Sequence, residues 1–445
     1  MAPYPELTFG VELEFIVSTY KEHMDDKKTL EAIAELFLRN LTTPLPCACI
    51  NRKWSKYKGV ANRYPDEVPL QKIEWKSHYC FSGDSSVVPN SKELSQKDAE
   101  EKVAAGLELS TRVLTFNEQG HSEFDAAVAA IKIGGSPKDT KIADKFDPSP
   151  TRSAGLHVHI GVESGLDLET AKKAAILGWL LEPCLFSLCN HHRGISPSHG
   201  PIRKHSLLAQ ARFDCTQPEG PEKILEENEH PDRQKTEATE HEKTDVSRES
   251  ALTKAEQPRD TQGTHEEEGV PADEDKPSSE GETSDSLPNE FSAQEKTWIS
   301  AIFGAKDMDE LANLLSSDNV NTMNRRLALV IYNRENDEST IEFRHFQSTM
   351  DEKLAWKWVR IAAALVRTAS KPASEYREKL QKIGSEYELI KPKWMQHVFD
   401  RTFQRETQDP WLDSWKWMLT VLNLEDDRDF WQDYVAQLPE RNRQT

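Results

Sequence analysis

The sequence predicts an α+β fold in which a sheet is backed by helices, with a helical C-terminal region and a disordered acidic insert. Three observations lead to this prediction. Stretches of strictly alternating apolar and polar residues indicate strands with one buried face. Amphipathic stretches indicate helices that cover such a face. A run of 76 residues, 217–292, is rich in charge and proline and has a single aromatic residue, so it cannot bury enough surface to offset the entropy of ordering it.

The strands are predicted from a period of two. In the stretch Leu7–Val17 every second residue is large and apolar, and the residues between them are mostly polar or glycine. Successive side chains of a strand point to opposite faces, so this pattern gives one apolar face and one polar face. Shorter stretches with strand-like patterns follow at residues 72–81, 107–113, 155–162 and 340–346.

The helices are predicted from apolar residues that recur every three or four positions. This pattern covers residues 29–41, 124–133 and 168–189. It dominates again from Asp351 to the end of the chain, where the segments are long and rich in tryptophan.

The negative charge of the chain is concentrated in the insert. The 445 residues carry a net charge of −20, and residues 217–292 alone hold 23 acidic and 8 basic residues. The rest of the chain is therefore close to neutral. We interpret the insert as a solvated spacer, and binding of a basic partner or phosphorylation is the alternative.

The composition argues against several classes of protein. No basic stripe is present that would displace counterions from nucleic acid, so we expect no nucleic-acid partner. No run of about 18 apolar residues is present, so we expect no membrane span. The first strand pattern begins at Leu7, so we expect no signal peptide. Six cysteines without a CxxC pair are typical of reduced thiols, and we expect a soluble, cytoplasmic protein.

Three pairs of polar residues lie two positions apart on predicted strands, so both members of each pair point to the same face. The opposite faces are mostly apolar, and helices packed there would leave all three pairs on one surface of one sheet. Converging carboxylates repel one another, and a divalent cation removes that cost. Carboxylate and imidazole ligands suit Mg²⁺ or Mn²⁺. The pairs are Glu12 with Glu14, His157 with His159, and Glu342 with Arg344.

Each pair also has an ordinary structural interpretation. Glu-x-Glu occurs on the wet face of amphipathic sheets, His-x-His can be structural, and Glu-x-Arg can form cross-strand salt bridges. Glycines on the same polar faces favour a functional interpretation of the three pairs together. Gly10, Gly155 and Gly161 indicate that something approaches the backbone closely there.

The segments around these pairs resemble the amidoligases, a family of the carboxylate–amine ligase superfamily that is related to glutamine synthetase and glutamate–cysteine ligase. Between the first two motifs, Trp75, an Asp84-x-Ser86 turn and the segment Gly106–Ser110 look like the intervening strands of that family. The resemblance spans about residues 7–351 and is interrupted by the insert. The motifs that carry it are Phe9–Phe15, Gly155–Gly161 and Ser339–Phe346, the last followed by Thr349–Asp351.

The resemblance implies a curved, antiparallel catalytic sheet of the glutamine synthetase type, with metal ions on its concave face. It also implies an ATP-dependent ligase that joins a carboxylate to an amine or to ammonia through an acyl phosphate. A metal-dependent hydrolase and a non-catalytic interaction scaffold stay open as alternatives.

Together with the composition of the insert, the resemblance gives a first catalytic part at residues 1–216 and a second at 293–351. The insert at 217–292 and a helical region at 352–445 lie outside the resemblance. We expect the helices of the last region to pack across the mouth of the active site as a lid.

The resemblance further implies a set of metal ligands. Glu12, His157 and Glu342 look like ligands of an ion nearest ATP. Glu14 and Glu108 look like ligands of a second ion, nearer the carboxylate substrate.

Two other residues would contact the nucleotide. His159 is similar to a position that contacts phosphate or nucleotide, and Arg344 to the arginine that stabilises the transferring phosphoryl group. Arg344 and Glu108 are thus the predicted catalytic residues, although the segment after Glu108 lacks the proline usual in the family. In the family, a loop that bears an arginine usually follows the helix after the His-x-His strand. Arg193 or Arg203 could be this arginine, or neither.

Overall fold

The computed structural model describes residues 5–20, 48–50, 79–84, 86–87, 102–132, 147–190, 192–195, 200–211, 287–317, 327–334, 339–399 and 410–438. All of them belong to a single compact unit of the chain. The predicted helix at residues 29–41, the predicted strand residues 72–78 and most of the predicted insert lie outside the described residues.

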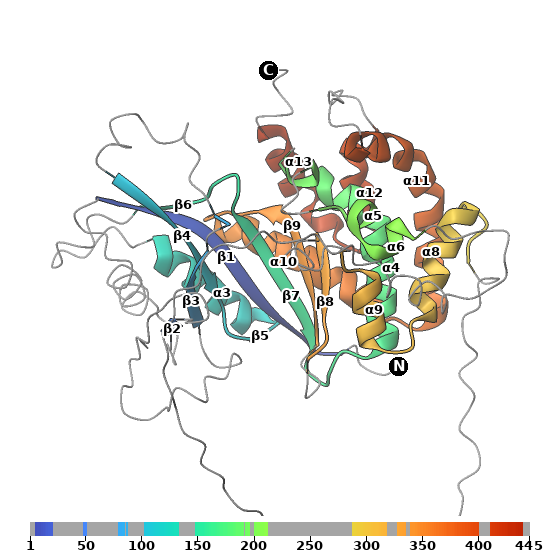
Figure 1. Cartoon of the computed structure of the whole chain (residues 1–445), viewed down its shortest axis with the longest axis horizontal. Coiled ribbons are helices and arrows are strands. Elements are labelled where there is room, and N and C mark those ends of the chain that lie inside the picture. The colour runs from blue at the N-terminus through green and yellow to red at the C-terminus, as the bar shows by residue number, and fades with distance from the viewer. Residues whose placement is uncertain are drawn as a thin grey trace, which may run out of the picture. The chain divides into compact units, whose positions relative to one another are not determined.

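One sheet organises the described part of the chain (Figure 1). Its strand order is β2-β3-β4-β1-β7-β9-β8, and the short strands β5 and β6 also pair with β1. Neighbouring strands are antiparallel, apart from β2 and β3, which are parallel. The strands are β1 (Leu7–Tyr20), β2 (Ala48–Ile50), β3 (Tyr79–Gly83), β4 (Lys102–Ser110), β5 (Leu114–Thr115), β6 (Asp147–Ser149), β7 (Gly155–Val162), β8 (Leu329–Tyr332) and β9 (Thr340–Gln347).

Helices make up most of the rest of the described chain. Short 3-10 turns at Arg193–Ile195, Pro410–Asp413 and Glu425–Asp427 connect some of them. No described helix has both the length and the apolar character needed to cross a bilayer. The helices are α3 (Glu118–Lys132), α4 (Leu168–Ser187), α5 (Ile202–His205), α6 (Leu207–Gln210), α8 (Ala293–Gly304), α9 (Met308–Leu314), α10 (Glu352–Ala369), α11 (Ala373–Phe399), α12 (Ser414–Val421) and α13 (Arg428–Gln437).

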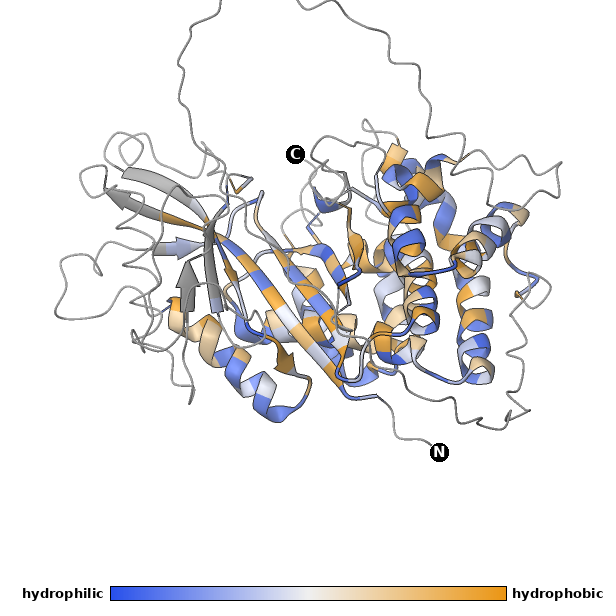
Figure 2. Ribbon diagram, turned by 60° about the horizontal axis from the view of Figure 1, so that its bottom comes forward, coloured by the Kyte–Doolittle hydropathy of each residue, from blue (hydrophilic) through white to orange (hydrophobic). Residues whose placement is uncertain are grey.

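The apolar face of the sheet is covered by α3, α4 and α10. The ring of Phe9 on β1 lies 6.2 Å from Phe124 of α3 and 5.6 Å from Trp356 of α10. Phe346 of β9 stacks on Trp358 of α10 at 4.7 Å. Apolar and polar residues alternate along the central strands, as the colours of Figure 2 show. The predicted sheet backed by helices is therefore confirmed as a mixed α/β fold, antiparallel in nearly all its strand pairs.

The C-terminal helices do not behave as the predicted lid where they meet the sheet. Helix α10 packs on the face that carries Phe9, whereas Glu12 and Glu14 project from the opposite face of β1. The lid prediction is wrong for this helix. Its apolar side is continuous with the apolar side of the sheet, and burial of both stabilises the fold.

Two predicted boundaries also differ from the structure. Residues 287–292, assigned to the end of the insert, are described, and Leu287 and Phe291 are buried in the core. The described part of the chain thus resumes before Ser292, at residue 287. Helix α3 begins six residues earlier than the apolar period indicates, because Asn117 accepts a hydrogen bond from the Gly120 N–H at its first turn.

Candidate metal and nucleotide site

The three predicted pairs lie on neighbouring strands, and the strand register places their members opposite one another. Glu12 of β1 lies opposite His157 of β7, and His159 of β7 lies opposite Glu342 of β9. On the other side of β1, Glu14 lies opposite Glu108 of β4. Directly opposed residues of antiparallel strands bring their Cβ atoms within about 5.5 Å. The predicted convergence of the pairs on one face is therefore present.

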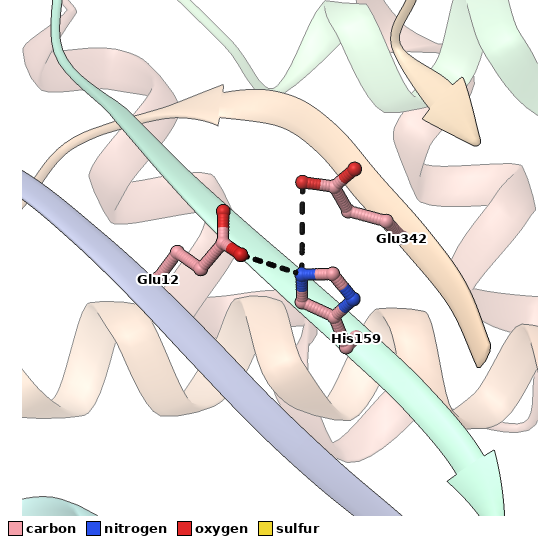
Figure 3. A group of neighbouring side chains, drawn as sticks. All are labelled: Glu12, His159 and Glu342. Atoms are coloured by element: carbon pink, nitrogen blue, oxygen red, sulfur yellow. Dashed lines mark hydrogen bonds and ion pairs between the residues drawn. The ribbon is translucent and has the colours of Figure 1, made fainter. Parts of the chain in front are cut away.

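The first group of ligand-type atoms, which we call the imidazole cluster, consists of Glu12, His159 and Glu342 (Figure 3). One ligand atom from each residue lies within 4.8 Å of the other two. His159 Nε2 lies 3.1 Å from Glu12 Oε1 and 3.7 Å from Glu342 Oε1. The side chain of Glu342 is fully buried, while Glu12 keeps 27% of its side-chain surface exposed.

His157 lies beside the imidazole cluster and reaches towards Glu14. Its Nδ1 is 3.1 Å from Glu12 Oε2 and 3.6 Å from Glu342 Oε1, and its Nε2 is 3.5 Å from Glu14 Oε1. The geometry thus brings both histidines near the two glutamates that were expected to share an ion with His157. His157 and His159 approach Glu12 and Glu342 to nearly the same distances, so a nitrogen of either ring could join the two glutamates.

The second group, which we call the acidic cluster, consists of Glu14, Asp84 and Glu108. Their ligand atoms also lie within 4.8 Å of one another. Glu14 accepts a hydrogen bond from the Gly155 N–H at 2.5 Å, and Glu108 accepts one from the Ser110 hydroxyl at 3.1 Å. The cluster contains the two residues predicted for a second ion and adds one acid to them.

Asp84 is the residue that the sequence interpretation did not assign. It lies just after β3, where its N–H donates to the Gly106 carbonyl at 2.9 Å and its carboxylate accepts from the Ser86 N–H at 2.7 Å. An Asp followed two residues later by Ser is a local turn signal. That signal marked the turn, but only the pairing of β3 with β4 brings Asp84 to Glu108.

The two clusters have opposite electrostatic character. Burial opposes ionisation of Glu12, yet the charge of His159 and hydrogen bonds from both histidines outweigh it and hold the pKa of Glu12 well below its usual value. Burial also disfavours the charged form of His159, but Glu12 and Glu342 raise its pKa. In the acidic cluster, burial and then the charges of Glu12, Glu14 and Asp84 raise the pKa of Glu108 well above its usual value.

Three arginines were candidates for contact with the ligand, and the structure separates them. Arg344 Nη1 lies 2.7 Å from Glu342 Oε1 and its side chain is 15% exposed, so it borders the imidazole cluster. Arg193 is fully buried beside Gly155. Arg203 pairs with Glu295 at 2.9 Å, a contact between α5 and α8. The guanidinium of Arg203 is therefore engaged in the helical core.

The glycines of the polar face have protein neighbours. A Cβ atom on Gly155 would lie 2.6 Å from His157 Nε2 and 3.0 Å from Arg193 Nη2, and one on Gly161 would lie 2.9 Å from Thr8 Oγ1. A Cβ on Gly10 would come no closer than 4.0 Å to the nearest atom, in His159. The close approach expected at Gly155 and Gly161 is thus made by side chains of this chain.

The donor sets of both clusters fit divalent cations. Carboxylate oxygens suit Mg²⁺ and Mn²⁺, and a neutral imidazole favours Mn²⁺ somewhat. Burial and the negative charges of Glu12, Glu14 and Asp84 raise the pKa of Glu108, and no member of the acidic cluster carries a positive charge. A cation at the acidic cluster would supply that charge.

A family model described as "putative amidoligase enzyme" matches residues 5–262 of the chain. The match covers more than half of the sequence and includes β1, β4 and β7, while β9 lies beyond it. No curated protein and no solved structure is significantly similar to the chain.

Proposed function

Because the chain belongs to the family of putative amidoligase enzymes, we propose that it is an ATP-dependent ligase that joins a carboxylate to an amine or to ammonia. The observation that carries the proposal is the adjacency of the two clusters. Glu12 and Glu14 of one strand contribute to separate groups of ligand atoms on the same face of the sheet. Two neighbouring cation sites beside an arginine suit the transfer of a phosphoryl group between oxygens.

The proposed reaction has two steps. A carboxylate oxygen of the acid attacks the γ-phosphorus of ATP, the bond to the bridging oxygen breaks, and ADP leaves. The amine nitrogen then attacks the carbonyl carbon of the acyl phosphate, loses a proton and expels inorganic phosphate. Divalent cations, when bound, neutralise the phosphate oxygens and hold them in place.

The residues of the chain have distinct parts in this proposal. Glu12, His157 and Glu342 would hold the ion nearest ATP, and the acidic cluster would hold the ion nearer the acid. Arg344 is held by Glu342 at 2.7 Å, and its guanidinium meets the charge that develops on the transferring phosphoryl group. Burial opposes the charge of Arg344, but Glu342, Glu12 and Glu14 raise its pKa, so it stays a cation. His159 keeps 11% of its side-chain surface exposed, and from the edge of the same cluster it would contact the phosphates.

Binding of Mg·ATP is the first test. A ligand at 100 times its Kd stabilises a folded protein by about 2.7 kcal/mol. We expect Mg·ATP to raise the Tm of the full chain and to lose this effect in Glu12→Ala and Glu342→Ala. Stabilisation by Mn²⁺ alone, indifferent to nucleotide, would favour a metal-dependent hydrolase. No response to either would favour a scaffold.

Turnover is the second test. Release of ADP is measured across a panel of carboxylic acids and amines, and only an acid and an amine together should give amide. In Arg344→Lys the rate should fall by about 100-fold, the effect of removing one well-placed electrostatic contact. Arg367→Lys is the matched control, because Arg367 lies over Phe116 on the helix-covered face of the sheet. ADP release that needs no acid would count against the ligase.

A further inference from the structure

Arg193 makes an unusual set of contacts with the end of β9. Its Nε donates to the His345 carbonyl at 3.0 Å, and its Nη2 donates to the carbonyls of Arg344 at 2.9 Å and Phe346 at 2.7 Å. Its Nη1 donates to the Ala154 carbonyl, just before β7, at 3.4 Å. One guanidinium thus binds the carbonyls of three consecutive residues of a strand. In a regular strand neighbouring carbonyls point in opposite directions, so this set requires an irregular backbone.

The irregularity is a β-bulge between β7 and β9. Leu156 pairs with Phe346 and Val158 pairs with Phe343, so a single residue of β7 lies opposite two residues of β9. The single residue is His157, and the two are Arg344 and His345. A bulge of this kind re-aims side chains and is common beside active sites. Here Arg344 points to the cluster face, and His345 packs against Phe186 of α4 on the covered face.

We propose that Arg193 is a positioning residue that holds the β9 bulge in shape and thereby fixes where Arg344 meets the transferring phosphoryl group. The inference rests on the proposed ligase function for its kinetic consequence, but the clamp itself is a matter of geometry. Arg193 is fully buried and donates to backbone carbonyls on both β7 and β9 sides of the bulge. It therefore acts on the reaction through the backbone of Arg344.

Lysine cannot reproduce this clamp. A guanidinium presents five N–H donors in a rigid plane, whereas an ammonium presents three donors from one atom. Gly155 supports the arrangement, since a Cβ atom there would lie 3.0 Å from Arg193 Nη2. The substitution Arg193→Lys keeps a cation in place and removes the fork, so it tests the geometry more directly than a neutral residue does.

Arg203 is the matched control. It is also buried, its Nη1 and Nη2 each bind a Glu295 oxygen at 2.9 Å, and its Nε donates to the Trp179 carbonyl at 2.9 Å. Arg203→Lys therefore breaks a comparable buried fork within the helical part of the molecule. A loss of function that came only from lower stability would be shared by the two variants.

The experiment compares full-length wild type, Arg193→Lys, Arg203→Lys, Arg344→Lys and the double variant Arg193→Lys/Arg344→Lys. We expect Arg193→Lys to lower kcat by roughly 10- to 100-fold, the scale of a small misplacement of a catalytic group, with the KM for ATP within about threefold of wild type. Arg203→Lys should lower Tm and leave kcat within about twofold. In the Arg344→Lys background, Arg193→Lys should cost little more, since its effect passes through Arg344.

Amide hydrogen exchange supplies a readout that needs no substrate. Exchange in the peptide covering residues 343–347 should accelerate in Arg193→Lys and stay as in wild type in Arg203→Lys. Unchanged exchange overturns the clamp whatever the activity is. If the falls in kcat of the two single variants multiplied in the double variant, Arg193 would act independently of Arg344, directly on substrate. A raised KM for the acid with unchanged kcat would lead to the same conclusion. If no acid and amine are joined but exchange accelerates as expected, the proposed ligase fails while the clamp stands.

Discussion

The imidazole cluster and the acidic cluster lie side by side on β1, and they balance their charge differently. In the imidazole cluster the two carboxylates face imidazoles and an arginine, so burial is compensated within the protein. In the acidic cluster the three ligand-type groups are all acids, and the pKa of Glu108 rises well above its usual value through burial and three neighbouring acids. Similar donor atoms thus lie in two electrostatic settings, one with cationic neighbours and one in which neighbouring acids raise a pKa.

The difference suggests a division of labour. A compensated cluster can keep its geometry before any ligand binds, which suits the placement of a nucleotide. An uncompensated cluster binds a cation tightly because the cation relieves repulsion.

The largest expected effect is on activity, and the two clusters should lose different parts of it. Glu342→Gln and Glu108→Gln are each expected to lower kcat by at least about 100-fold. Only Glu342→Gln should also abolish the rise in Tm caused by Mg·ATP, because Glu342 belongs to the cluster nearest the nucleotide. Glu386→Gln, on the exposed side of α11, is the control. Equal loss of Mg·ATP stabilisation in both variants would remove the proposed division between the clusters.

Glu182 is a buried carboxyl group outside the site, and it separates the effect of burial on a pKa from the effect of repulsion between acids. Glu182 of α4 is fully buried and accepts hydrogen bonds from the backbone N–H groups of Ile202 at 2.6 Å and Arg203 at 3.4 Å. Burial nevertheless raises its pKa to about 8, against the charge of Arg203. Burial alone can therefore account for part of the raised pKa in the acidic cluster.

This raised pKa predicts a pH dependence of stability. The folded protein keeps the proton of Glu182 where the unfolded chain has lost it, so its contribution is present below about pH 4.5 and is lost as the pH rises to about 8. The slope is up to about 1.4 kcal/mol per pH unit. Denaturant unfolding of wild type and Glu182→Gln at several pH values measures it. The variant should show a flatter profile between pH 5 and 8, and parallel profiles would contradict the raised pKa.

Much of the site could be predicted because it follows from a period of two on long strands. Helices cover one face of β1 and β7, so alternation alone predicts which residues lie on the polar face. Glu12, Glu14, His157 and His159 were placed on one surface in this way. Register could not be read in this way. His157 and His159 both come within 3.7 Å of Glu342, and the bulge that sets this register does not appear in the simple alternation over residues 340–346.

The residues that the sequence did not assign depend on contacts distant in the chain. Asp84 lies on a turn without periodicity and reaches Glu108 only through the pairing of β3 with β4. Arg193 and Arg203 look alike in sequence, as cations after a long helix. Only the packing of their surroundings distinguishes a clamp on β9 from an ion pair with Glu295. The roles of buried cations are set by tertiary partners, which local patterns do not encode.

The smallest expected effect tests the contrast between the clusters most directly, in the absence of metal. At pH 7.5 in EDTA, Glu12→Gln should lower Tm by roughly 2–4 °C, the scale of about 1 kcal/mol. Glu12 has a lowered pKa, so its carboxylate contributes stability above about pH 4.5 that is lost in the amide.

Glu108→Gln should shift Tm in the opposite direction by a similar amount. The pKa of Glu108 is raised, so protonated Glu108 contributes stability at low pH that is lost as the pH rises and the group ionises. The uncharged amide of the variant keeps this contribution at pH 7.5. Addition of Mg²⁺ should then stabilise wild type more than Glu108→Gln, since the variant has less repulsion to relieve. A fall in Tm for both variants in EDTA would mean that the acidic cluster is compensated within the protein, and the contrast on which its role as a cation site depends would be lost.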